Sequence, residues 1–72
     1  MRKRSVIIAN RHNTSISLEE EFMQELENIA LAQHKTINQL VTEIDSERIS
    51  SNLSSAIRIY ILRYIKQKNT EH

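Results

Sequence analysis

The stretch that decides the fold is Thr14-Ser15-Ile16-Ser17-Leu18-Glu19-Glu20-Glu21-Phe22. Its first five residues alternate with period two, which is typical of a half-buried strand with a core-facing side and a polar side. The core-facing side carries Thr14, Ile16 and Leu18, and the polar side carries Asn13, Ser15 and Ser17. The three glutamates that follow suit the first turn of a helix, where the helix dipole favours negative charge. The stretch therefore predicts a strand that leads directly into a helix.

Apolar residues at helical spacing predict three helices after this strand. The first is expected from about residue 19 to residue 33, with Phe22 and Leu26 on its core-facing stripe. The second should begin after Thr36, a good N-cap, and end around residues 45–48. The third follows a polar link over residues 46–51, with Asn52 as its N-cap, and is expected from residue 53 to about residue 67.

The chain contains no Gly, no Pro and no Cys. The absence of Cys excludes disulfides and thiolate metal sites. The absence of Gly favours helices over hairpin-rich folds, because tight hairpin turns usually need Gly. His34 stands in the connection between the first two helices, where a Gly with left-handed backbone is common. We expect His34 to hold that conformation, since His tolerates it better than most residues.

The size of the chain favours association with a second copy. Its 72 residues fit one small domain, which buries only about 60% of its unfolded surface when it folds alone. In the third helix, Ile59 and Leu62 lie behind the main apolar stripe, so a second chain is expected to cover them. Tyr60 and Tyr64 are spaced to stack on one helix face, and we interpret them as core or dimer contacts. The sequence therefore predicts a homodimer.

Charge is segregated along the chain, although the formal net charge is only +1. Residues 1–18 hold Arg2, Lys3, Arg4 and Arg11 and no acid, whereas residues 19–34 hold five glutamates and no base. A basic start is a common footprint of nucleic-acid binding, and a solvated, disordered start is the alternative. The expected organisation is a basic arm over residues 1–13, a domain over residues 14–67 and a frayed tail over residues 68–72.

Catalysis and membrane insertion are not indicated. The three histidines lie in separate contexts, and no pair of them has metal-ligand spacing on one helix. No serine stands in an activating motif, and there is no Gly-rich phosphate loop. The apolar runs are far shorter than the roughly 18 residues of a membrane span. We expect a cytoplasmic protein that is not an enzyme, with no cofactor, no metal and no membrane partner.

A single strand over residues 14–18 would leave its backbone groups unpaired, and antiparallel pairing with a second copy resolves this. With that pairing, the chain resembles the ribbon-helix-helix family of Arc/MetJ-type bacterial DNA-binding proteins. Besides the opening stretch, the residues that carry the resemblance are Leu26, Ile29, Ala30, Thr36, Leu40 and Val41. Residues 40–45 and 52–58 resemble more narrowly a branch of small alphaproteobacterial proteins with a third helix.

The resemblance implies a mainly α fold with one short N-terminal strand and an intertwined homodimer, whose two-stranded intersubunit ribbon enters the major groove of double-stranded DNA. Base contacts would come from Asn13, Ser15 and Ser17, a face without Arg or Lys. Phosphate contacts would come from basic residues and the start of the second helix, namely Arg2, Lys3, Arg4, Arg11, Lys35, Thr36, Ile37 and Asn38. The dimer core would consist of Ile16, Leu18, Phe22, Leu26, Leu40, Val41 and Ile44.

Two alternatives stay open. The first is a ribbon-helix-helix dimer that acts as a protein-interaction or antitoxin-like module, with a protein partner on the C-terminal helix. The second is architectural: residues 6–9 could form a hairpin with residues 14–18 inside one chain. The loop over residues 10–13 contains no Gly, which disfavours this hairpin.

Overall fold

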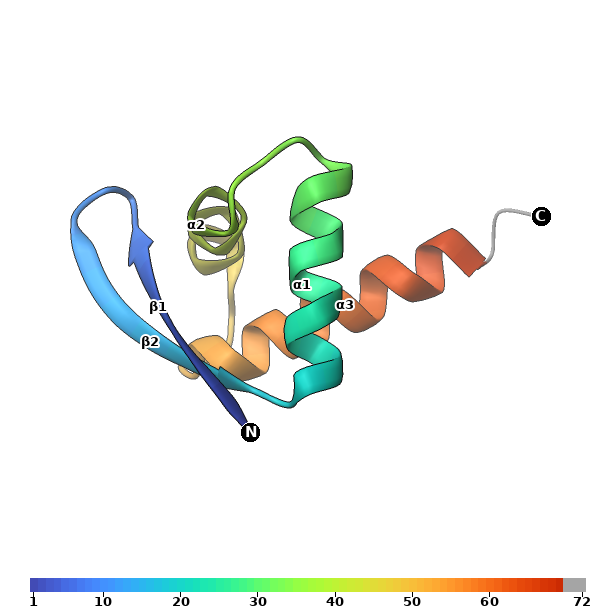
Figure 1. Cartoon of the computed structure of the whole chain (residues 1–72), viewed down its shortest axis with the longest axis horizontal. Coiled ribbons are helices and arrows are strands. Elements are labelled where there is room, and N and C mark those ends of the chain that lie inside the picture. The colour runs from blue at the N-terminus through green and yellow to red at the C-terminus, as the bar shows by residue number, and fades with distance from the viewer. Residues whose placement is uncertain (70–72) are drawn as a thin grey trace.

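The computed structural model describes residues 1–69, which form a two-stranded antiparallel sheet followed by three helices (Figure 1). The elements are β1 (Arg2–Ile8), β2 (His12–Leu18), α1 (Glu20–Ala32), α2 (Ile37–Glu47) and α3 (Leu53–Asn69). This order confirms the predicted ribbon-helix-helix architecture with an additional C-terminal helix. Helix α3 runs two residues beyond its expected end, and residues 70–72 of the predicted tail lie outside the described residues.

The ribbon forms within one chain, which corrects the expectation of a single strand paired with a second copy. Strand β1 pairs with β2 from Arg2 opposite Leu18 to Ile8 opposite His12, so most of the expected arm is a strand. The turn needs no Gly, because Ala9 (φ 54°) and Asn10 (φ 59°) take the left-handed backbone that a type I′ turn requires. The N–H of Arg11 closes the turn by donating to the carbonyl of Ile8 at 3.1 Å. The unpaired strand that argued for an obligate dimer is therefore absent from residues 1–69.

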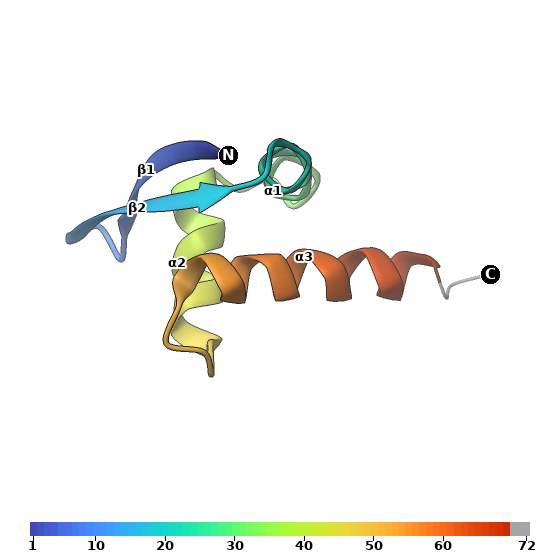
Figure 2. The ribbon, with the colours of Figure 1, turned by 90° about the horizontal axis from the view of Figure 1, so that it is seen from below.

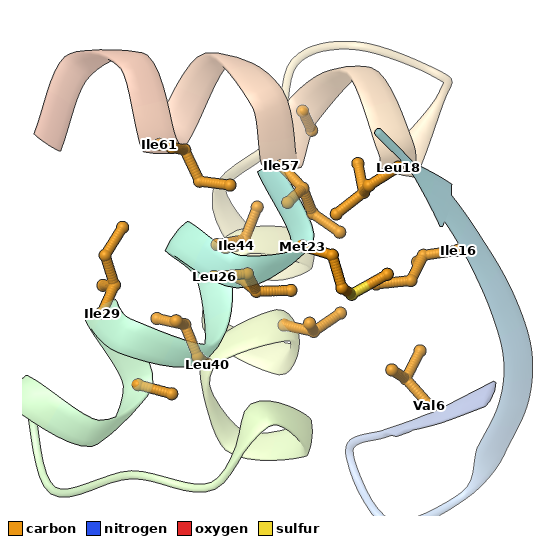
Figure 3. Close-up of a cluster of buried hydrophobic side chains, with 13 residues drawn as sticks. Val6, Ile16, Leu18, Met23, Leu26, Ile29, Leu40, Ile44, Ile57 and Ile61 are labelled. Carbon is orange, nitrogen blue, oxygen red and sulfur yellow. The ribbon is translucent and has the colours of Figure 1, made fainter. Parts of the chain in front are cut away.

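The core lies between the inner side of the hairpin and the three helices (Figure 3). Its buried side chains are Val6, Ile16, Leu18, Met23, Leu26, Ile29, Ala30, Leu40, Val41, Ile44, Ala56, Ile57 and Ile61. Six of the seven residues expected in a dimer core belong to this set, and Phe22 is half-buried against it. Because these six are already covered within one chain, a dimer that keeps this fold must use other surfaces.

The helix starts follow the capping signals in the sequence. Thr36 and Gln39 form a capping box, in which the Thr36 hydroxyl accepts from the Gln39 N–H at 3.1 Å and the Gln39 amide oxygen accepts from the Thr36 N–H at 2.8 Å. The Asn52 side chain accepts from the Ser55 N–H at 3.1 Å. His34 has φ 58°, as predicted for the α1–α2 connection.

Side chains of α2 and α3 hold both edges of the hairpin. On the β1 edge, the Ile7 N–H donates to Asn38 Oδ1 at 3.1 Å and the Ala9 N–H donates to Thr42 Oγ1 at 3.0 Å. On the β2 edge, the Ser17 N–H donates to Ser54 Oγ at 3.3 Å. These bonds fix which side of the ribbon faces the helices and which side faces away.

Helix α3 crosses beneath the hairpin, and its C-terminal half projects beyond α1 (Figure 2). Tyr60 and Tyr64 stack with ring centroids 6.3 Å apart and pack against the core, as expected for core contacts. Ile59 and Leu62 are 45% and 50% exposed in the single chain. The part of α3 that the sequence assigned to a second chain is thus uncovered in the monomer.

Candidate nucleic-acid interface

The outer face of the hairpin is the side that points away from the core. Alternation along both strands places three directly opposed pairs there: Lys3 with Ser17, Ser5 with Ser15, and Ile7 with Asn13. Five of these six residues are exposed, and Ser17 is half-buried. The structure therefore brings the three predicted base-contacting residues, Asn13, Ser15 and Ser17, together on one surface.

Strand β1 supplies half of this outer face, and the sequence reasoning missed that half. Ser5 and Ile7 had no predicted role, and Lys3 was expected only as part of an arm. With Lys3 beside Ser17, the face does carry a cation, which corrects the expectation of a face without Arg or Lys. The signal that could have found these residues is the period-two pattern of Arg4, Val6 and Ile8, which matches the core-facing pattern of β2.

Arg2 and Arg4 lie on the inner side of the same strand, where they bind acids of α1. Arg2 donates to Glu20 at 3.2 Å and to Glu27 at 3.3 Å, and Arg4 donates to Glu27 at 3.4 Å. Both arginines were expected to attract phosphate. In this fold they tie β1 to α1, so their charge is largely neutralised locally.

Lys3 and Arg11 are differently placed. Lys3 is exposed on the outer face, and Arg11 is exposed in the turn at the end of the hairpin. Within residues 1–69, neither side chain makes an ion pair. Of the four bases predicted to attract phosphate from the N-terminal segment, these two keep their charge available to a ligand.

The predicted phosphate site at the start of α2 is largely occupied by contacts within the chain. The Thr36 hydroxyl is used by the capping box, and Asn38 Oδ1 holds the Ile7 N–H. Lys35 Nζ lies 2.6 Å from Glu43 Oε2 and donates to Gln33 Oε1 at 3.1 Å. An open hollow of ≈ 590 Å³ lies beside these residues and the hairpin turn. Thr36 and Asn38 at the start of α2 line it, whereas Ile37 does not, and its lysine is already paired with an acid.

The corner where β2 meets α1 is closed by Arg58 of α3. Its Nε donates to Glu19 Oε1 at 2.9 Å, and its Nη2 donates to the Ser17 carbonyl at 3.4 Å. The hydrogen bond from Arg58, followed by one from a backbone N–H, holds the pKa of Glu19 below its usual value. Glu19, the acid directly after β2, is therefore paired with the cation of Arg58.

The side chains of the outer face can form hydrogen bonds with base edges. Short hydroxyl and amide side chains can donate to and accept from base edges, and a lysine can contact guanine or phosphate. Within residues 1–69, no cluster of His, Asp or Glu could hold a metal ion. None of the helices in that part of the chain has the length and apolar character needed to cross a bilayer.

Residues 1–65 match the family described as the ribbon-helix-helix domain, so the matched region includes both strands and reaches into α3. No match was found among curated proteins or among solved structures.

Proposed function

Because the chain belongs to the ribbon-helix-helix domain family, we propose that it is a DNA-binding regulator that inserts the β1–β2 hairpin into the major groove. Proteins of this family are generally DNA-binding transcription regulators. The observation that carries the proposal is the outer face, whose exposed residues are polar or basic except for Ile7. A two-stranded ribbon has the width to enter the major groove, where all four base pairs can be distinguished.

In this proposal the outer face reads bases and the free cations attract phosphate. The Asn13 amide can pair with adenine, and the Ser15 and Ser17 hydroxyls can meet either donors or acceptors. Lys3 can reach guanine or a phosphate, and Arg11 supplies attraction that does not depend on sequence. Arg2, Arg4 and Lys35 contribute less, because each is already paired with a glutamate.

Selection from a pool of random duplexes, followed by fluorescence anisotropy on the selected site, tests base reading. Changing Ser15→Ala together with Ser17→Ala should reduce discrimination by roughly 1–3 kcal/mol for each lost contact, with little effect on random DNA. Gln24→Ala, at an exposed position on α1, is the matched control and should change neither. No binding of any duplex at about 50 mM salt, where phosphate contacts are strongest, would refute the proposal.

A salt series separates the two kinds of cation. Lys3→Ala should reduce the slope of log K against log salt by about 0.9, the value for one phosphate contact. Arg2→Ala should change this slope less, because Arg2 is bound to Glu20 and Glu27. If Lys3→Ala and Arg2→Ala reduce the slope equally, then the position of a cation on the outer or the inner side of β1 does not determine whether it contacts DNA.

The exposure of α3 supports a second candidate function, a protein-interaction module. Leu62 is 50% exposed on a helix that projects from the body (Figure 2). If a protein partner is the main ligand, Leu62→Asp should abolish its capture, whereas Ser15→Asp on the outer face should not. The DNA proposal predicts the reverse sensitivities in DNA binding.

A further inference from the structure

The link between α2 and α3 borders a hollow that is separate from the outer face of the hairpin. Its volume is ≈ 330 Å³, and no residue of β1 or β2 lines it. Pockets for small molecules usually measure about 300–1,000 Å³, so this one has room for a small ligand only. Its wall is mainly apolar: Ile44 and Ala56 come from the core. Ile49 and Ile59 are 100% and 45% exposed beside them. We call this site the link hollow.

Two opposite charges line the link hollow without pairing. Glu47 is the last residue of α2, and Arg63 belongs to α3. Within residues 1–69, neither of them forms an ion pair, with the other or with any third residue. Arg48 also lines the hollow, but its Nε lies 2.8 Å from Asp45 Oδ1. The link hollow therefore offers one free carboxylate and one free guanidinium beside an apolar wall.

We propose that the link hollow binds a free amino acid with an apolar side chain. The carboxylate of this ligand accepts two parallel hydrogen bonds from the Arg63 guanidinium, and its ammonium group donates to the Glu47 carboxylate. Its side chain covers Ile49 and Ile59, which is favourable because apolar surface leaves water on both partners. The proposal does not rest on DNA binding.

The two free charges favour this class of ligand over simpler ones. An apolar carboxylic acid would satisfy Arg63 but cover Glu47 without a partner, and an apolar amine would do the reverse. Covering a charge in this way costs free energy, because the charge loses water and gains no hydrogen bond in return. Only a ligand that carries both charges satisfies both residues.

The uncharged polar groups of the wall favour an apolar side chain on the ligand. The Tyr60 hydroxyl lines the link hollow but already accepts from the Gln33 amide at 3.0 Å. The Ser50 hydroxyl lines it too, and it accepts from the Asn52 N–H at 3.1 Å. A polar ligand side chain would therefore meet groups that are already hydrogen-bonded, and it would leave the apolar wall in contact with water.

An NMR titration of the isotope-labelled chain with L-leucine tests the proposal. The amide signals that move should cluster within residues 44–63, around the link hollow, and the change should saturate. A titration to about 50 mM is sufficient, because a ligand of this size should bind with a dissociation constant of about 10 mM or lower.

Three probes each lack one group of leucine. Isocaproate lacks the ammonium group, isoamylamine lacks the carboxylate, and L-alanine lacks most of the side chain. Each should bind about 10-fold more weakly than leucine, since each loses either a charged hydrogen bond or most of the apolar contact.

Two variants assign each ligand group to its residue. Glu47→Gln should weaken leucine binding by about 10-fold but should not weaken isocaproate, which has no ammonium group to lose. Arg63→Gln should weaken leucine equally but should not weaken isoamylamine. Glu21→Gln and Lys66→Gln are the matched controls, because both residues are exposed and lie outside the link hollow. Circular dichroism checks that each variant is folded.

Three results would overturn the proposal. One is the absence of a saturating change with leucine up to about 50 mM, and another is a change that maps to the hairpin or α1. The third is leucine binding that isocaproate and isoamylamine match or that neither Glu47→Gln nor Arg63→Gln weakens. A chain that binds no DNA but binds leucine in this way would refute the proposed function and leave the link hollow standing.

Discussion

The two sides of the hairpin use the same two strands for different purposes. On the inner side, Val6, Ile16 and Leu18 are buried in the core, and Arg2 and Arg4 bind the glutamates of α1. On the outer side, short polar residues and one lysine are exposed. The inner side stabilises the fold, whereas the outer side contributes little to stability and is available to a ligand.

The comparison teaches that the number of basic residues in a segment does not give the number of cations available to a ligand, because some of them form ion pairs within the fold. Arg2, Lys3 and Arg4 are consecutive, and composition alone treats them alike. The register assigns Lys3 to the outer side and both arginines to the side that meets Glu20 and Glu27. Only after this assignment does the basic N-terminal segment separate into residues that hold the hairpin and a residue that can meet DNA.

The largest effect should come from placing an acid on each side in turn. Ile16→Asp buries an unpaired charge and should lower the free energy of unfolding by roughly 3–5 kcal/mol, enough to unfold much of the population. Ser15→Asp, at the neighbouring position on the outer side, should change the free energy of unfolding by less than about 0.5 kcal/mol. The same change should abolish DNA binding, because the new carboxylate repels the phosphates. Urea denaturation followed by circular dichroism measures the first quantity. If Ile16→Asp and Ser15→Asp lower the free energy of unfolding by similar amounts, then the inner and outer sides of the hairpin do not differ in their contribution to stability.

A disulfide across the outer face tests whether the ribbon belongs to one chain. Ser5 and Ser15 are directly opposed, and their pair lies between ladder bonds, where Cα atoms are about 4.5 Å apart. In the cysteine-free chain, Ser5→Cys with Ser15→Cys should form an intrachain disulfide that stabilises by roughly 2–4 kcal/mol. A non-reducing gel should show monomers, with each single variant as control. Covalent dimers would instead place the two strands in different chains.

The turn can be relaxed without touching either side. The left-handed backbone of Ala9, at φ 54°, is sterically unfavourable because its Cβ approaches the following carbonyl. Ala9→Gly should therefore raise the free energy of unfolding by about 0.5–1 kcal/mol. Ala56→Gly, the same change inside α3, should lower it by about 1 kcal/mol or more. A destabilising Ala9→Gly would mean that the strands are joined by a different turn.

The smallest effect concerns the corner held by Arg58. The pKa of Glu19 is lower in the folded chain than in the unfolded one, so its carboxylate stabilises the fold above its ordinary pKa. That contribution is lost as pH falls through the folded value. Arg58→Ala should move the pKa of Glu19 back toward the ordinary value, as read from the carbonyl chemical shift during an acid titration. An unchanged pKa would show that Arg58 does not hold this corner.

The helices and the strand β2 could be predicted because their signals are local. The Thr36 cap, the left-handed His34 and the alternation around Ile16 each depend on a few neighbouring residues. Strand β1 was predicted to be part of an arm because its turn contains Ala9 and no Gly, and Asn10, which tolerates left-handed backbone, is a weak turn signal by itself. The energy that holds β1 comes from distant partners, including Glu27 and Asn38.

The candidate site was predicted only in part for the same reason. The polar side of β2 was identified from its own alternation, whereas Lys3, Ser5 and Ile7 join it through the register of the hairpin. Asn38 and Lys35 were assigned to phosphate from their place at a helix start. Their contacts with Ile7 and Glu43 connect residues that the sequence does not place together.

The hydrogen bonds at the hairpin edges also affect the tendency of this protein to aggregate at high concentration. A two-stranded sheet has two open edges, and each can template the addition of further strands and lead to fibrils. Here α2 occupies the β1 edge at Ile7 and Ala9, and α3 occupies the β2 edge at Ser17. An incoming strand therefore meets a short run of outward backbone groups on either edge, too few for a stable register. We expect the folded chain to resist fibril growth, with detachment of β1 as the step that exposes a longer edge.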